Sequence, residues 1–106
     1  MERWVRIGDA DAFSRHAVLT ASVDVLRIAV FCTQAGLFAI EDRCPHRGGR
    51  LSQGLLYEPC KVACPDHGWG IDLRTGQAEP PERGEVRTFE AKIEDNAVWV
   101  KMTGCG

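Results

Sequence analysis

The sequence alternates between short apolar runs and clusters of turn-forming residues, and helical periodicity is nearly absent. Asp9–Ser14 is the exception, and its pattern predicts one turn of helix. The apolar runs are rich in β-branched and aromatic residues and are bounded by Gly, Pro, Asn and Asp, which is the pattern of β-strands. The predicted strands are Trp4–Ile7, Ala17–Thr20, Val25–Cys32, Leu37–Glu41, Leu55–Glu58, Lys61–Ala63, Ile71–Leu73, Gln77–Glu79, Val86–Ile93 and Ala97–Lys101.

Turn residues between these runs predict antiparallel hairpins. The turns are expected at Gln34–Gly36, at Pro59-Cys60, at Arg74–Gly76 and at Asp95-Asn96. Pro80–Gly84 is a break, because a central strand does not tolerate two prolines. Turn signals about every 8–12 residues indicate a small antiparallel sandwich or barrel, so we expect an all-β fold.

Composition narrows the class of protein. A chain of 106 residues, with 44% hydrophobic and 26% charged residues, is typical of one globular domain, which we expect to cover residues 1–106. The formal net charge of −2 gives no basic patch for nucleic acid. No apolar run approaches the roughly 20 residues of a membrane helix, and the N-terminal residues do not resemble a signal peptide. We therefore expect a cytoplasmic protein that binds neither nucleic acid nor membrane.

The candidate chemistry lies in cysteine and histidine. The sequence contains five Cys and three His, and an odd number of cysteines cannot all pair in internal disulfides. Two segments, Cys44-Pro45-His46 and Cys64-Pro65-Asp66-His67, each follow a predicted strand. The intervening segment is long enough to run out along one strand and back along the next. We therefore expect two loops, at about 43–50 and 64–70, to lie side by side and present these two Cys and two His together.

Two kinds of metal centre use such a set. Zinc accepts two Cys and two His as a tetrahedron, whereas a Rieske [2Fe–2S] cluster takes two thiolates and two imidazoles on different irons. The Cys-x-His spacing favours the cluster, because each loop must send its Cys and its His to different metal ions. Zinc sites more often use pairs that chelate one ion. Glycines in both loops, which would let the backbone approach a cluster, are Gly48, Gly49, Gly68 and Gly70.

The paired motif resembles the Rieske-type ferredoxin family, and the resemblance covers Trp4–Lys101. It implies an antiparallel sandwich or barrel with a small cluster-binding subdomain formed by the two loops. The ligands that it implies for one [2Fe–2S] cluster are Cys44, His46, Cys64 and His67. The two thiolates would bind the inner iron, and the two imidazoles would bind the outer, redox-active iron. The implied function is one-electron transfer with a redox protein partner, and we expect no catalytic site in the chain itself.

Departures from the high-potential members of that family point to a low reduction potential. Gly49 and Asp66 stand where those proteins carry two further cysteines joined as a disulfide. Trp69 stands where they place a serine whose hydroxyl donates to a cluster sulfide. The resemblance therefore implies a carrier near the low end of the Rieske range, about −150 mV. We expect the charge of Asp66 either to lower the potential further or to face a basic partner.

Within the low-potential group, the second half of the chain is similar to the small subunit of assimilatory NAD(P)H nitrite reductase. The similarity lies in Cys64–Gly76, which includes Trp69, and in the run Pro-Pro-Glu-Arg-Gly-Glu-Val-Arg-Thr-Phe at 80–89. It implies a large partner subunit that holds flavin, sirohaem and the nitrite site. Two alternatives stay open. One is a free ferredoxin that carries electrons from a flavin reductase to a ring-hydroxylating dioxygenase, and the other is a structural zinc-binding interaction module.

The other three cysteines have no histidine at ligand spacing. We expect Cys32 to be a core thiol within its strand and Cys60 to be a turn thiol, too far along the chain from Cys64 to share a metal atom. Cys105 is expected to be an exposed thiol in the C-terminal tail.

Overall fold

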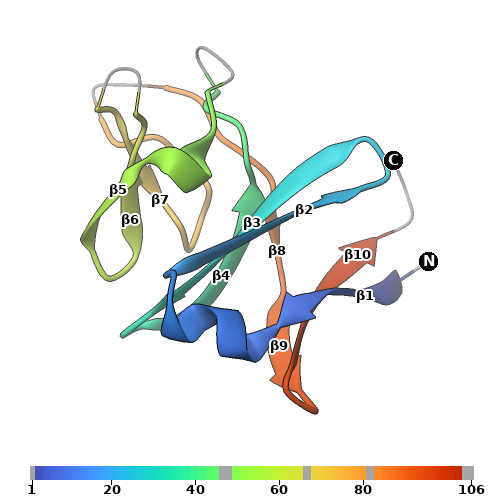
Figure 1. The fold of residues 1–106 in the computed structure, drawn as a ribbon. Helices are drawn as coiled ribbons and strands as arrows, with labels where there is room; N and C mark the ends of the chain where they lie inside the picture. The colour runs from blue at the N-terminus through green and yellow to red at the C-terminus, as the bar shows by residue number, and fades with distance from the viewer. Residues whose placement is uncertain (1, 46–48, 66–67, 81–82, 104–106) are drawn as a thin grey trace.

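The computed structural model describes residues 2–45, 49–65, 68–80 and 83–103. Within these ranges the chain forms ten β-strands in three antiparallel sheets and two short 3₁₀ helices, which confirms the predicted all-β fold (Figure 1). The strands are β1 (Glu2–Asp9), β2 (Val18–Val23), β3 (Leu26–Thr33), β4 (Gly36–Glu41), β5 (Leu55–Glu58), β6 (Lys61–Ala63), β7 (Gly70–Asp72), β8 (Thr88–Phe89), β9 (Ala91–Glu94) and β10 (Ala97–Thr103). The helices are η1 (Ala10–Ser14) and η2 (Leu51–Gln53).

The three sheets are stacked so that one lies between the other two. The middle sheet has the strand order β2-β3-β4-β8, and the sheet that contains both ends of the described chain has the order β1-β10-β9. The third sheet, β5-β6-β7, forms a separate small subdomain (Figure 1). Both cysteine motifs adjoin this third sheet in the chain, since Cys64 follows β6 and the first motif lies between β4 and β5.

Strand β3 is buried on both faces, and its alternate side chains enter two different cores. Ile28 and Val30 pack into a core against the β1-β10-β9 sheet, which we call the terminal core. Ala29 and Phe31 pack into a core against the small subdomain, which we call the loop core. The terminal core consists of Val23, Ile28, Val30, Ala39, Val98, Val100 and Met102. The loop core consists of Ala29, Phe31, Ile40, Cys44, Leu51, Val62, Cys64, Ile71, Leu73 and Val86.

This two-sided burial explains why β3 reads as a continuous apolar run and not as an alternating one. The predicted start of the strand at Val25 is wrong, because Val25 belongs to the turn between β2 and β3 and is 97% exposed. Asp24 in the same turn has a positive φ of 56°. A short aspartate side chain tolerates that conformation better than a β-branched one.

The predicted strand Val86–Ile93 is divided in the structure. Its first part, β8, pairs with β4 of the middle sheet, and its second part, β9, pairs with β10 of the neighbouring sheet. The chain crosses between the sheets at Glu90, whose carbonyl accepts a hydrogen bond from the Lys101 N–H. Two sheets in different layers cannot share one straight strand, and the apolar pattern does not reveal where the chain changes sheet.

Gln77–Glu79 does not form the predicted strand with Ile71–Leu73. The structure shows isolated bridges, Ile71 with Ala78 and Gln77 with Glu85. The two segments still pair across the predicted turn, since Asp72 N–H donates to the Gln77 carbonyl and Glu79 N–H to the Gly70 carbonyl, but further backbone bonds go to other segments. Leu73 N–H donates to the Cys60 carbonyl and Ala78 N–H to the Gly84 carbonyl.

The remaining turns agree with the sequence. Asp95 and Asn96 connect β9 and β10 with positive φ values of 53° and 59°, as the mirror-image hairpin turns require. The predicted helical turn is present as η1. Helix η2 was not predicted, since three residues carry no helical periodicity. No helix in the described ranges is long and apolar enough to cross a membrane.

Gly76 allows the backbone at Val86 to pass close to the turn after β7. It has a φ of +78°, and a Cβ placed there would lie 2.2 Å from the Val86 carbonyl oxygen. We expect Gly76→Ala to destabilise the fold by about 2 kcal/mol, from backbone strain and the displaced Val86 carbonyl. Equilibrium urea unfolding measures this difference.

Gly8→Ala is the matched control, because its Cβ would lie 3.7 Å from Leu19 Cδ1, an ordinary contact. We expect its free energy of unfolding to stay within about 0.5 kcal/mol of that of the original chain. Equal losses of unfolding free energy in the two variants would show that the close approach of Val86 to Gly76 is not the cause of the destabilisation.

Candidate metal centre

The two cysteine loops are closed in the same way. Cys44 N–H donates to the Gly49 carbonyl at 2.7 Å, and Cys64 N–H donates to the Trp69 carbonyl at 2.8 Å. In both loops the cysteine amide therefore reaches the carbonyl of residue i+5. The second loop has a further bond, from Gly68 N–H to the Cys64 carbonyl at 2.8 Å, and Gly68 has a φ of +72°.

The structure brings the two cysteines together in one core. Cys44 and Cys64 are 0% and 2% exposed, and both belong to the loop core. Neither forms a disulfide bond. Two segments that stand apart in the sequence thus place their thiols on the same side of the middle sheet, as the spacing predicted.

His46 and His67, the other two predicted ligands, lie outside the described residues, and so does Asp66. Their positions in the chain fall inside the two closed loops, 44–49 and 64–69. In the described ranges no three residues among His, Cys, Asp and Glu gather as metal ligands. The described part of the site is therefore the cysteine pair with its surrounding core.

The chemistry of this pair fits a metal cofactor. Thiolates are soft ligands that bind zinc, copper(I) and iron–sulfur clusters. An ionised thiolate in an apolar core is costly unless a metal or another positive group balances its charge. Both cysteines pack in an apolar core, which includes the fully buried Leu51 and Val62 and against which Trp69 packs. Two thiolates here would be shielded from water, and the cysteine backbones are fixed by their amide bonds to Gly49 and Trp69.

A hydrogen-bonded pair that the sequence did not single out lies at the base of the first loop. Asp42 accepts hydrogen bonds from the Ser52 N–H and from the Ser52 hydroxyl, each at 2.7 Å. The two residues are 2% and 9% exposed. A buried aspartate two positions before a cysteine has no distinctive sequence pattern, because its partner is ten residues away.

A charged network lies beneath the end of the second loop. Lys61 Nζ is 2.5 Å from Glu79 Oε1 and 3.3 Å from Glu58 Oε2, and the bond to Glu79 is the main reason that the pKa of Lys61 is raised. Glu79 N–H donates to the Gly70 carbonyl. The hydroxyl of Tyr57 covers Gly70, since a Cβ on that glycine would lie 2.1 Å from it. The network therefore links strands β5, β6 and β7 at the point where the second loop ends.

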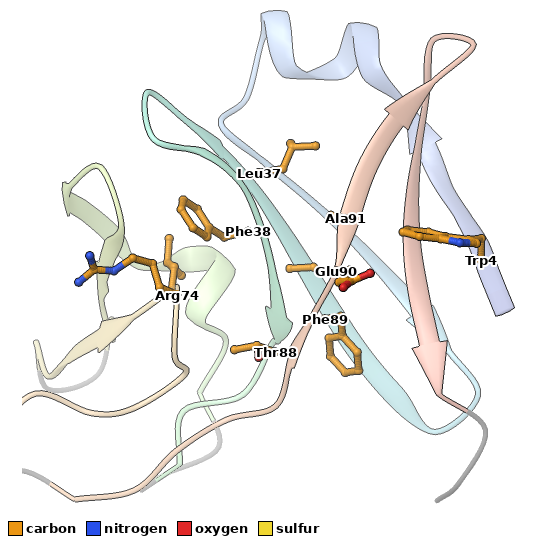
Figure 2. A pocket seen from close by; sticks show the side chains of 10 residues that line it. Trp4, Leu37, Phe38, Arg74, Thr88, Phe89, Glu90 and Ala91 are labelled. Carbon is orange, nitrogen blue, oxygen red and sulfur yellow. The ribbon is translucent and has the colours of Figure 1, made fainter. Parts of the chain in front are cut away.

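A surface hollow of about 540 Å³ lies elsewhere, between β4, the β8–β9 crossing and the turn after β7 (Figure 2). Neither Cys44 nor Cys64 lines it. Its lining is Trp4, Leu37, Phe38, Ala39, Leu73, Arg74, Thr88, Phe89, Glu90 and Ala91. Arg74, the cation of this lining, is already held by Asp72 at 2.9 Å. The hollow is therefore separate from the candidate metal centre.

Comparison with protein families identifies the family of the chain. A family model described as a Rieske-like [2Fe-2S] domain matches residues 3–101. The chain belongs to this family. Its cofactor is one Rieske [2Fe–2S] cluster, and its role is electron transfer, as predicted. The assignment favours the cluster over the zinc alternative.

Individual relatives agree with the family. The chain is 34% identical over 103 residues to an anthranilate 1,2-dioxygenase ferredoxin subunit from Burkholderia cepacia, which covers 96% of this chain and 94% of that protein. The fold is similar to the ferredoxin of carbazole 1,9a-dioxygenase from Nocardioides aromaticivorans, with a TM-score of 0.80, 23% identity and coverage of 92% and 95%. It is also similar to a protein assigned as an NADH-dependent nitrite reductase small subunit from Mycobacterium tuberculosis, with a TM-score of 0.85, 17% identity and 98% coverage of both chains.

Tyr57 reports on the network beneath the second loop of this Rieske domain. Its pKa is raised above 10.0, first by partial burial and then by the negative charge of Glu79. We expect Glu79→Gln to lower the pKa of Tyr57 towards 10 without reaching it, because the burial remains. The chain has one tyrosine, so the ring ¹³Cζ shift followed by NMR against pH measures this titration without overlap.

The control is Glu94→Gln, which removes a carboxylate that pairs with Lys92 and does not act on Tyr57. It should leave the midpoint unchanged. A midpoint that responds equally to both variants would contradict the placement of Glu79 beside the ring.

Proposed function

We propose that Cys44, His46, Cys64 and His67 hold the [2Fe–2S] cluster and that the chain carries single electrons between protein partners. The observation that supports this ligand set most directly is the burial of both cysteines in one core, each at the start of a loop with the same i+5 closure. The two histidines lie within those loops in the sequence, with the spacing that a Rieske cluster requires.

The residues around the site hold the ligands and exclude water. The loop core surrounds the thiols with apolar side chains, and Trp69 covers it from the second loop. When bound, the cluster supplies a one-electron acceptor and donor. In the arrangement that the family implies, the two thiolates hold the buried iron and the two imidazoles hold the outer one, where electrons enter and leave. No group of the chain needs to act as an acid, a base or a nucleophile.

For the partner, we infer the oxygenase component of a dioxygenase system, with a flavin reductase as electron donor. This inference relies on the 34% identity to the anthranilate dioxygenase ferredoxin subunit over nearly the whole of both chains. In this role the chain is one cytoplasmic domain that moves between two enzymes.

A second candidate partner is the large subunit of an NAD(P)H nitrite reductase. The run at 80–89 and Trp69 favour it in the sequence. The fold of the Mycobacterium tuberculosis protein is compatible with it, since it matches 98% of this chain. In either case the expected potential is low, because Gly49 cannot form the disulfide of high-potential Rieske proteins and Trp69 offers no hydroxyl at the serine position.

The ligand set is tested by single cysteine substitutions. Cys44→Ser and Cys64→Ser should reduce bound iron from two per chain to nearly none, because a serine hydroxyl is a poor replacement for a thiolate ligand. They should also abolish the rhombic EPR signal of the reduced protein. Iron is measured by colorimetric assay on freshly purified protein.

Cys32→Ser and Cys60→Ser are the controls, because both residues are partly buried thiols outside the two loops. The structure also corrects the expectation that Cys32 is a core residue, since it is only partly buried. Both controls should keep the full iron content. Retention of the cluster by Cys44→Ser or Cys64→Ser would refute the ligand assignment.

The partner is tested by mixing the reduced protein with two purified acceptors and following its reoxidation in a stopped-flow instrument. One acceptor is the oxygenase component of anthranilate 1,2-dioxygenase with its substrate and oxygen, and the other is the large sirohaem subunit of nitrite reductase with nitrite. We expect faster reoxidation by the oxygenase, by at least about tenfold, which corresponds to 1.4 kcal/mol in the barrier. Faster reoxidation by the sirohaem subunit would overturn the choice of partner and leave the carrier role intact.

A further inference from the structure

The first loop is closed at its base by a buried carboxylate. Asp42 Oδ1 accepts from the Ser52 N–H and Asp42 Oδ2 from the Ser52 hydroxyl, both at 2.7 Å, so both oxygens of one side chain bind one residue across the loop. In the part of the chain that the structure describes, these two side chains are the buried polar ones. We call this pair the Asp42–Ser52 clamp.

Burial of a carboxylate is costly, and two hydrogen bonds return only part of the cost. An apolar pair of similar volume could fill the same space at no loss of stability. The position of the clamp gives the carboxylate a different use, because Asp42 and Ser52 lie at the two ends of the segment that contains Cys44. Fixing them restricts the path of the chain between them.

The two ends are also fixed to separate parts of the fold. Asp42 N–H donates to the Arg27 carbonyl at 2.8 Å, which anchors the entrance of the loop to the start of β3. At the exit, Ser52 lies in η2 beside Leu51, which is fully buried in the loop core. The clamp thus joins the middle sheet to the small subdomain directly before Cys44.

The second loop has the same i+5 closure and a further backbone bond among the described residues. There the Cys64 amide and carbonyl both take part in backbone bonds, with Trp69 and Gly68. In the described part of the first loop, the corresponding closure is the single bond from Cys44 N–H to the Gly49 carbonyl. The clamp adds a side-chain restraint across the base of the first loop, between residues on either side of Cys44 and Gly49.

We propose that Asp42 is a positioning residue for the cluster, which acts through Ser52 to hold the first loop closed and Cys44 in place to bind iron. The proposal rests on the ligand role of Cys44 proposed above. In the protein without the cluster, the clamp limits opening of the first loop. In the protein with the cluster, it therefore slows the release of iron.

The test measures iron release from the holoprotein to an excess of a ferrous chelator, together with the EPR spectrum after reduction. Asp42→Ala removes both acceptors and should speed iron release by about tenfold or more, with a shift in the EPR g values. Ser52→Ala removes one donor and should speed it by a smaller factor. Asp42→Asn keeps one acceptor for the Ser52 N–H and an amide that can donate to the Ser52 hydroxyl, so it should release iron at a rate close to the original.

Asp72→Ala is the matched control. Asp72 also accepts from a backbone N–H and a side chain, both of Arg74, but it lies at the end of β7 outside the two loops. It should lower the melting temperature without changing the rate of iron release or the EPR spectrum. A melting curve accompanies each variant, and Ser52→Ala decides the result if Asp42→Ala does not fold.

Equal rates of iron release in Ser52→Ala, Asp42→Ala and Asp72→Ala would overturn the proposal. Release from Asp42→Asn as fast as from Asp42→Ala would also overturn it, because the hydrogen bonds would then not be the cause. The two proposals fail separately. A Cys44→Ser variant that keeps its iron refutes the ligand assignment, whereas a Cys44→Ser variant without iron and an unaffected Asp42→Ala refute only the clamp.

Discussion

The fold depends on the burial of one hairpin, β3–β4, from both sides. Alternate residues along β3 enter different cores, with Ile28 on one face and Ala29 on the other, and Ala39 and Ile40 repeat this division on β4. Every other layer packs against this hairpin. The β1-β10-β9 sheet covers one face, and the small subdomain with its cysteines covers the other (Figure 1). The position of the metal centre therefore follows from the end of β4, which leads directly into the first loop.

The two loops share one backbone closure and are held by further hydrogen bonds of different kinds. Each keeps its cysteine in an apolar core and uses the cysteine amide to turn the chain back at residue i+5. In the part of the chain that the structure describes, the second loop also has a glycine at positive φ and a further backbone bond, and the first loop is joined at its base by Asp42 and Ser52. Rigid ligands reduce the rearrangement that accompanies a change of charge, which is the requirement for a carrier whose only reaction is gain and loss of an electron.

Most strands and the cysteine pair could be predicted from the sequence, because both depend on local patterns. Alternation of apolar residues indicates β6 and β10, and the spacing around Cys44 and Cys64 indicates a metal site. What could not be predicted depends on contacts between distant residues. The division of Val86–Ile93 is set by two sheets that compete for one segment, and the burial of Asp42 is set by a serine ten residues away. His46 and His67 lie outside the described residues, and their proposed place among the ligands rests on their spacing in the sequence.

The pairing of the first and last strands has a consequence for how this domain is used in larger proteins. Glu2 is paired with Thr103 in the β1–β10 ladder, so the two ends of the described chain are neighbours on the sheet that faces away from the cysteine loops. A domain with adjacent ends can be spliced into a longer polypeptide with two short connections and no distortion of its interior. Oxidoreductase NdmD from Pseudomonas putida contains a matching segment that makes up 19% of its length. The same architecture therefore suits both a separate carrier and a module within a longer chain.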